Sequence, residues 1–130
     1  MKFKENYSLK DFNTFGIACS ARWFASYSSA DELRDIIGSE LYHSSASLLI
    51  GRGSNLLFLN DYQGLVIHSE MQDVRVVEHD DRSVLLEVGA GMLWDDLVDY
   101  AVEKGWWGIE NLSLIPGEVG AAAVQNIGAY

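Results

Sequence analysis

The sequence has few of the features that mark cross-linked, membrane-spanning or nucleic-acid-binding proteins. Its single cysteine, Cys19, excludes an internal disulfide. No apolar run approaches the ~20 residues that cross a bilayer, and no signal-peptide core follows the N-terminus. The 9 basic and 19 acidic residues give a net charge of −10, without the basic footprint of a nucleic-acid-binding surface. We therefore expect a soluble cytoplasmic protein that binds neither membrane nor nucleic acid.

Metal binding and aromatic stacking also have little support. The three histidines lie at no familiar metal-ligand spacing, so no metal site is expected. They are His43, His68 and His79. The tryptophans beside the second predicted helix favour core packing over a stacking platform for a ligand. They are Trp94, Trp106 and Trp107.

Hydrophobic residues make up 48% of the 130 residues, enough for one compact domain or two small lobes. Ser29 and Glu32 match a capping box at the start of a helix, which Gly38 is expected to end in a left-handed turn. Gly105 is expected to end a second, amphipathic helix at residues 93–104. The predicted strands are residues 21–27, 48–50, 64–67, 74–77 and 84–88, the last two forming a hairpin around Asp80 and Asp81. This order predicts an α+β fold whose two lobes divide near residues 70–73.

The first glycine loop, residues 51–55, brings two glycines, an arginine, a hydroxyl and an amide to one turn after a buried strand. Consecutive backbone N–H groups in such a turn can form a concave nest for phosphate oxygens. A Walker loop would end in Gly-Lys-Ser or Gly-Lys-Thr, and a Rossmann loop would open a helix, so neither scheme fits the apolar residues 56–59 that follow. A tight structural turn remains an equal alternative. Arg52 is the candidate cation, with a solvent-facing arginine as the alternative.

The second glycine segment, residues 115–130, combines a turn, small residues and amides. Pro116 and Gly117 predict the turn, and Gly120 and three alanines leave a surface without bulk. Gln125 and Asn126 carry both donors and acceptors. A flat heteroaromatic ligand such as a flavin suits this arrangement. The alternative is a tightly packed helix start after Pro116.

Five motifs spread over nearly the whole chain occur in a familiar order. They are Asn13-Thr14-Phe15-Gly16-Ile17, Gly51-Arg52-Gly53-Ser54-Asn55-Leu56-Leu57, Val88-Gly89-Ala90-Gly91, Gly108-Ile109-Glu110-Asn111-Leu112 and the stretch from Ile115-Pro116-Gly117 to Gly128-Ala129-Tyr130. With these motifs the chain resembles the UDP-N-acetylenolpyruvoylglucosamine reductase (MurB) family, flavoenzymes of peptidoglycan precursor synthesis. The resemblance implies an α+β FAD-binding domain of the vanillyl-alcohol-oxidase/MurB type. Residues 1–70 would form its first lobe and residues 71–130 an incomplete second lobe, with the substrate domain absent.

The resemblance also implies which residues contact the cofactor. The first glycine loop would hold the FAD pyrophosphate, and the second segment would line the flavin and part of the substrate approach. The implied FAD-binding residues are Gly51, Arg52, Gly53, Ser54, Asn55, Leu56, Ile115, Pro116, Gly117, Gly120, Ala121, Ala122, Gln125, Asn126, Ile127 and Gly128. Tyr130 is the one implied substrate contact.

In the family, NADPH passes a hydride to the flavin, which passes it to the enolpyruvyl double bond of the UDP-sugar. A side-chain acid then protonates the adjacent carbon, and negative charge on the substrate carboxylate needs a cation or acid to stabilise it. The family's arginine, serine and glutamate for these steps match no position here. We therefore expect no catalytic residue in this chain, which would be the N-terminal FAD-binding part and inactive alone.

Two departures and two alternatives accompany the resemblance. Ala123 stands where many relatives have proline, and Arg52 stands where glycine or glutamate is common. A non-catalytic flavin- or nucleotide-binding module that acts with a partner chain is the main alternative. A flavin oxidase that tethers FAD through histidine is weaker, because neither glycine segment contains one. Unpaired strand edges in a cut second lobe would favour self-association.

Overall fold

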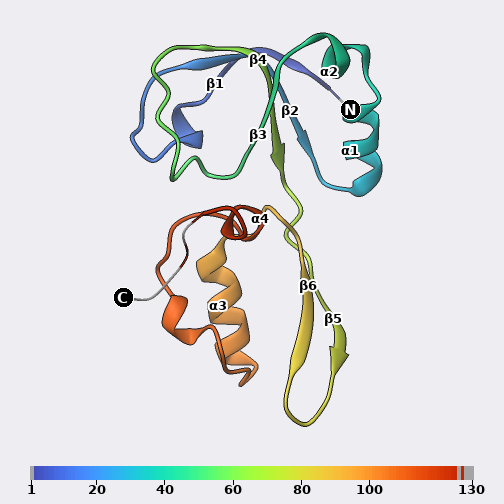
Figure 1. Cartoon of the computed structure of the whole chain (residues 1–130), viewed down its shortest axis with the longest axis vertical. Coiled ribbons are helices and arrows are strands. Elements are labelled where there is room, and N and C mark those ends of the chain that lie inside the picture. Colours follow the sequence, from blue (N-terminus) through green and yellow to red (C-terminus); the bar gives the residue numbers. More distant parts are fainter. Residues whose placement is uncertain (1, 126, 128–130) are drawn as a thin grey trace. The chain divides into compact units, whose positions relative to one another are not determined.

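The structure, a computed structural model, describes residues 2–125 and 127. The chain divides into two compact units, Met1–Glu70 and Met71–Tyr130, each with its own sheet (Figure 1). The first unit contains β1 (Lys4–Ser8), a 3-10 helix (Lys10–Phe12), β2 (Ser20–Tyr27), α1 (Ala30–Ile37), α2 (Glu40–Ser44), β3 (Ser47–Ile50) and β4 (Tyr62–Ser69). The second contains β5 (Val74–His79), β6 (Val84–Val88), α3 (Trp94–Glu103), a 3-10 helix (Glu110–Leu112) and α4 (Val119–Ala122).

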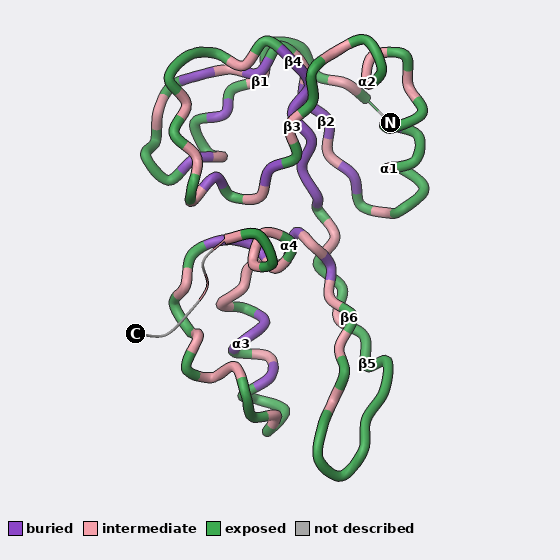
Figure 2. Tube along the Cα trace, viewed as in Figure 1, coloured by how far each residue is buried: buried purple, intermediate pink, exposed green. Residues whose placement is uncertain are grey.

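The first unit is built on a four-stranded mixed sheet in the order β1-β2-β4-β3. β1 is antiparallel to β2, whereas β2 and β3 both run parallel to β4. Residues 64–69 of the central strand β4 are all buried, which is the pattern of a strand covered on both faces (Figure 2). The carboxyl ends of the three parallel strands therefore lie at one edge of the sheet.

An aromatic cluster fills one side of this sheet. The Phe24 ring stacks on Tyr7 at 4.1 Å between centroids and lies 5.3 Å from Phe12. Phe12 also contacts the ring of His68 edge-on at 5.0 Å. Leu9, between β1 and the 3-10 helix, is completely buried in this core. The cluster ties the 3-10 helix and the chain after it to the sheet.

The second unit pairs a β-hairpin with an amphipathic helix. β5 and β6 are antiparallel and largely exposed, as Figure 2 shows. α3 buries Leu97, Val98 and Ala101 on one face. Gly105, with φ of +72°, ends that helix as predicted. Among the helices of the described residues, none has the length and apolar character of a membrane span.

Most strands match the sequence prediction, with three differences. The serine cap is confirmed, since Glu32 N donates to Ser29 Oγ at 3.2 Å. The prediction for Gly38 is wrong: its φ of −75° is right-handed, and its N–H donates to Arg34 O at 2.8 Å, which continues the helical hydrogen bonding. The predicted loop before Ser47 contains α2, which Ser39 caps through Tyr42 N at 3.2 Å. β1 was absent from the prediction.

Candidate functional site

The first glycine loop leaves the carboxyl end of β3. Ile50, the last residue of that strand, is buried, whereas Arg52 and Asn55 are exposed. Gly53 has a φ of +70°, a left-handed conformation that favours glycine. Ligands of parallel sheets bind beyond the carboxyl ends of the strands, so the loop occupies an edge where an anion can approach it. The remaining predicted loop residues, Gly51, Ser54 and Leu56, are half-buried.

Irregular chain follows the loop, as predicted. Residues 56–61, all of which the structure describes, contain no helix before β4 begins at Tyr62. A phosphate at this loop would therefore be held without the dipole of a following helix, unlike the phosphate of a Walker or Rossmann loop.

The back of the loop touches residues 12–14. Gly53 is buried, and a Cβ built on it would lie 1.9 Å from Phe12 O and 2.8 Å from Asn13 Cα. Gly53 O accepts hydrogen bonds from Thr14 N and Leu56 N, each at 3.4 Å. Only glycine fits this approach. The sequence prediction placed Asn13 and Thr14 in a family motif but not in the site, because residues so distant in sequence give no sign of contact.

The second glycine segment is anchored to the chain that leads into α3. Three backbone hydrogen bonds join them: Gly120 N to Ala90 O at 3.0 Å, Val119 N to Met92 O at 2.8 Å and Trp94 N to Gly117 O at 2.9 Å. A Cβ at Gly120 would lie 2.8 Å from the Ala90 Cβ, so the small residue permits the close approach. The helix start that the sequence offered as an alternative is present as α4. Sequence reasoning did not foresee the pairing of residues 89–94 with this segment.

The predicted residues of this segment differ in exposure. Gly117, with φ of +114°, is buried. Ile115, Ala121, Ala122 and Ile127 are half-buried, and Pro116 and Gly120 are exposed. The Gln125 side chain folds back, and its Nε2 donates to Pro116 O at 3.3 Å. Asn126, Gly128 and Tyr130 lie outside the described residues. The described members of the two predicted groups belong to different units: residues 51–56 to the first, and residues 115–117, 120–122, 125 and 127 to the second.

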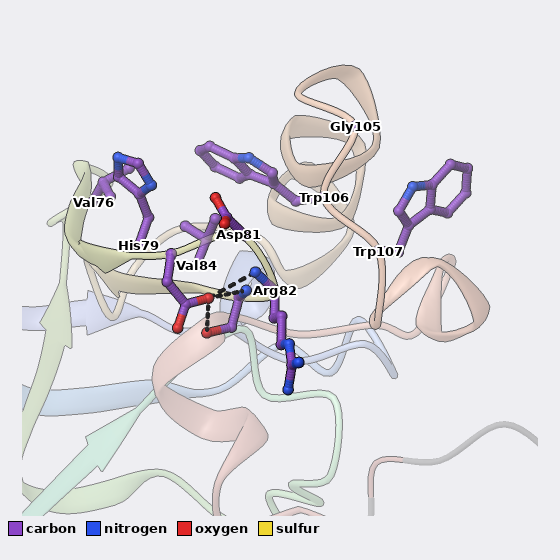
Figure 3. A pocket seen from close by; sticks show the side chains of 10 residues that line it. Val76, His79, Asp81, Arg82, Val84, Gly105, Trp106 and Trp107 are labelled. Carbon is purple, nitrogen blue, oxygen red and sulfur yellow. Dashed lines mark hydrogen bonds between the residues drawn. The ribbon is translucent and has the colours of Figure 1, made fainter.

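A separate pocket of about 440 Å³ lies between the hairpin turn and the chain after α3 (Figure 3). Its lining includes His79, Asp81, Arg82 and Trp106 but none of the predicted cofactor residues. Trp106 is half-buried and packs edge-on against Tyr100 at 5.9 Å. Trp107 is 82% exposed, so the prediction of a core position is wrong for this tryptophan. The pocket is open, and its charged side chains belong mainly to the turn.

The shifted titratable groups are explained by local structure. Hydrogen bonds from the N–H groups of Arg82 and Ser83 lower the pKa of Asp80. The backbone N–H of Gly108, bonded at 2.5 Å, lowers the pKa of Glu110. Burial, together with the charge of Asp61, raises the pKa of Cys19. Within the described part of the chain, no three His, Cys, Asp or Glu residues gather as metal ligands.

Comparison with known proteins identifies the family. A family model described as "FAD binding domain" matches residues 22–130. The chain is 57% identical over 127 residues to a UDP-N-acetylenolpyruvoylglucosamine reductase of Bacteroides fragilis, covering 98% of this chain and 38% of that protein. It is 48% identical over 130 residues to the enzyme of that name from Porphyromonas gingivalis, and this alignment covers 100% of this chain and 38% of that protein. The chain thus spans well under half the length of these curated relatives.

A solved structure extends the similarity to the fold. The crystal structure of UDP-N-acetylenolpyruvylglucosamine reductase (MurB) from Thermus caldophilus matches with a TM-score of 0.67 and 29% identity, over 93% of this chain and 40% of that one. The predicted α+β fold class and the predicted family are confirmed, and FAD is the cofactor of that family. The chain belongs to the FAD binding domain family, and its relatives there are the UDP-N-acetylenolpyruvoylglucosamine reductases.

Proposed function

We propose that this chain is the FAD-binding part of a reductase that converts UDP-N-acetylglucosamine enolpyruvate to UDP-N-acetylmuramate with NADPH. The observation that carries the proposal is the 57% identity to a reductase of that name over 98% of the chain. The alignment with the Porphyromonas gingivalis enzyme covers the whole chain, so it includes both glycine segments that would hold FAD.

The residues of the first loop suit the diphosphate of FAD. The loop combines a left-handed glycine, a hydroxyl, an amide and a guanidinium at the carboxyl edge of parallel strands. A protein with a net charge of −10 needs local donors and a cation to hold a dianionic group, and Arg52 supplies the cation in this loop. We assign the pyrophosphate to residues 51–56, and the flavin side to residues 115–117, 120–122 and 125–128.

The chain's own residues would bind and orient the cofactor. FAD, when bound, supplies the redox chemistry by taking a hydride from NADPH and delivering it to the enolpyruvyl double bond. The small residues Gly120, Ala121 and Ala122 would let a flat ring approach the backbone closely. We assign no proton transfer to a residue of this chain and propose that the two units, residues 1–70 and 71–130, are lobes of one FAD-binding domain. The substrate contact predicted for Tyr130 remains a proposal.

The binding claim is tested by titrating the purified chain with FAD, FMN and riboflavin. Flavin absorbance and fluorescence should report saturable binding of FAD, and FAD should bind more tightly than riboflavin because only FAD carries the diphosphate. The absence of any flavin signal change at equimolar protein and FAD would contradict the proposal.

The reductase claim is tested on the product of the complete reading frame that encodes this chain. That protein should oxidise NADPH over many turnovers only when the enolpyruvyl UDP-sugar is present to reoxidise the flavin, and the 130-residue chain should show no such turnover. A reading frame that ends naturally at Tyr130, with FAD binding and no turnover, would instead support the non-catalytic module that acts with a partner chain.

A further inference from the structure

The cofactor assignment above gives no role to the motif at residues 13–17, of which only Asn13 is buried. Asn13 is only 5% exposed, and its side chain organises the turn around it. Its Nδ2 donates to Leu9 O at 2.8 Å and to Ile17 O at 3.2 Å, and its Oδ1 accepts from Ile17 N at 2.9 Å. Gly16, with φ of +63°, closes the turn through its N–H to Asn13 O at 3.2 Å. We call residues 12–17 the Asn13 turn.

The Asn13 turn forms the wall against which the first glycine loop rests. Phe12 O and Asn13 Cα occupy the space where a side chain at Gly53 would be. Thr14 N donates to Gly53 O at 3.4 Å. The contact is therefore made by backbone on both sides, and the position of that backbone in the turn is set by the amide of Asn13.

This contact fixes the direction of the peptide group between Gly53 and Ser54. Gly53 O is turned toward Thr14 N and Leu56 N. In a planar trans peptide the N–H points opposite to the C=O, so the Ser54 N–H is directed away from the Asn13 turn. A backbone N–H held in a fixed direction is the kind of donor that an anion-binding nest requires.

We propose that Asn13 is a positioning residue for the FAD diphosphate, acting through the Asn13 turn on the backbone at Gly53. The inference rests on the proposed binding of FAD by residues 51–56. Its physical basis is that a loop already held in its binding conformation loses less freedom on binding. Without the Asn13 amide, Leu9 O and Ile17 O lose the hydrogen bonds from Asn13 Nδ2, and Ile17 N loses its bond to Asn13 Oδ1, so the turn no longer holds Gly53 in place.

The test compares Asn13→Ala and Asn13→Ser with the unmodified chain. Serine replaces the amide with a hydroxyl, which can still form a hydrogen bond in the turn, and is therefore the milder change. Asn60→Ala is the matched control, because Asn60 is an exposed asparagine of the same unit. Far-UV circular dichroism and urea unfolding establish that each variant is folded. Dissociation constants are then measured for FAD and for riboflavin, and ³¹P NMR records the diphosphate of bound FAD.

The Asn13 variants should bind FAD at least about tenfold more weakly, with little change for riboflavin and with shifted ³¹P resonances. Asn60→Ala should match the unmodified chain. Three results would overturn the inference, since each points to a role in the fold alone. They are an equal loss of affinity for FAD and riboflavin, unchanged FAD binding, and failure of both Asn13 variants to fold. If the unmodified chain itself binds no FAD, the proposed function fails, which is a distinct result.

Discussion

Two glycines of the first unit share a backbone conformation but differ in what surrounds them. Gly16 and Gly53 have φ values of +63° and +70°. A Cβ at Gly16 would meet nothing within 4 Å, whereas one at Gly53 would overlap Phe12 O. Substituting the two glycines therefore separates the free-energy cost of left-handed backbone from the free-energy cost of steric overlap.

We expect Gly16→Ala to lower the free energy of unfolding by about 1–2 kcal/mol, the cost of left-handed alanine. Gly53→Ala should cost more, about 2–5 kcal/mol, because steric overlap adds to the same strain. Urea unfolding monitored by circular dichroism measures both. Equal losses for the two variants would show that the loop can move away from Phe12, and would weaken the structural account of the Asn13 turn.

For single residues, the sequence predicted which glycines form turns better than it predicted the residues that these glycines contact. Glycine at position 53 is readable as a turn because glycine tolerates positive φ. Its contact with Phe12 depends on how β1 and β2 bring residues 12–14 beside the end of β3, which no local pattern encodes. The same limit hid the contact between Gly120 and Ala90.

Among the elements, α1 offers a direct test of its predicted cap. Ser29 Oγ accepts from Glu32 N, while the Glu32 carboxylate accepts from Ser28 N at 2.6 Å. Ser29→Ala should lower the free energy of unfolding by about 1 kcal/mol through loss of the cap. Ser28→Ala is the matched control, because Ser28 contributes its backbone N–H, which alanine retains. A similar loss in both variants, measured by urea unfolding, would argue against the cap.

The turn of the β5–β6 hairpin depends on an ionised carboxylate. Asp80 Oδ1 accepts from Arg82 N at 2.7 Å and from Ser83 N at 2.8 Å, and these bonds lower the pKa of Asp80. Because the pKa of Asp80 is lower in the folded than in the unfolded state, its carboxylate stabilises the hairpin at pH values above the unfolded-state pKa of about 3.9. This stabilisation is lost as the pH falls through the folded-state pKa.

Asp80→Asn should therefore increase amide hydrogen exchange at Arg82 and Ser83 at pH 6, relative to the unmodified chain. The difference should narrow as pH falls through the lowered pKa. Asp81→Asn is the control, because these two turn bonds end on Asp80. An NMR titration that places the carboxyl pKa of Asp80 at or above about 3.9 would refute the account.

Elements with a strong local signal were predicted, and elements that depend on distant partners were not. α3 and the hairpin have clear periodicity and capping or turn residues. β1 is mostly exposed, so its sequence shows no alternation, and pairing with β2 makes it a strand. α2 has only five residues, too few for a visible helical period.

For the whole molecule, the order of the motifs predicts FAD as the ligand, whereas neither glycine segment alone does. By itself the first loop is equally compatible with a structural turn, and the second segment has a packed helix start as its alternative. The structure contains both of these features. A backbone that forms a tight turn can also bind a phosphate, since both require the same positive-φ glycines and directed N–H groups. Only binding measurements separate the two roles.

The surface of the second unit leads to a prediction about association. In the described residues, β5 and β6 form a two-stranded sheet whose outer edges carry no further strand. Val76, Val77 and Leu85 on this hairpin are 41%, 43% and 55% exposed. Unpaired edges beside apolar side chains favour pairing with another chain. We therefore expect the isolated 130-residue chain to self-associate as its concentration rises.

Size-exclusion chromatography with light scattering measures this association. A Val77→Lys and Leu85→Lys double variant should shift the chain toward monomer, because charge on the hairpin opposes edge-to-edge pairing. Leu59→Lys is the control, since Leu59 is 81% exposed but lies in the first unit, outside any strand. It should leave the association unchanged. A clean monomer of the unmodified chain at high concentration would contradict the prediction. If Leu59→Lys reduces the association as much as the hairpin double variant does, general surface charge rather than the hairpin controls assembly.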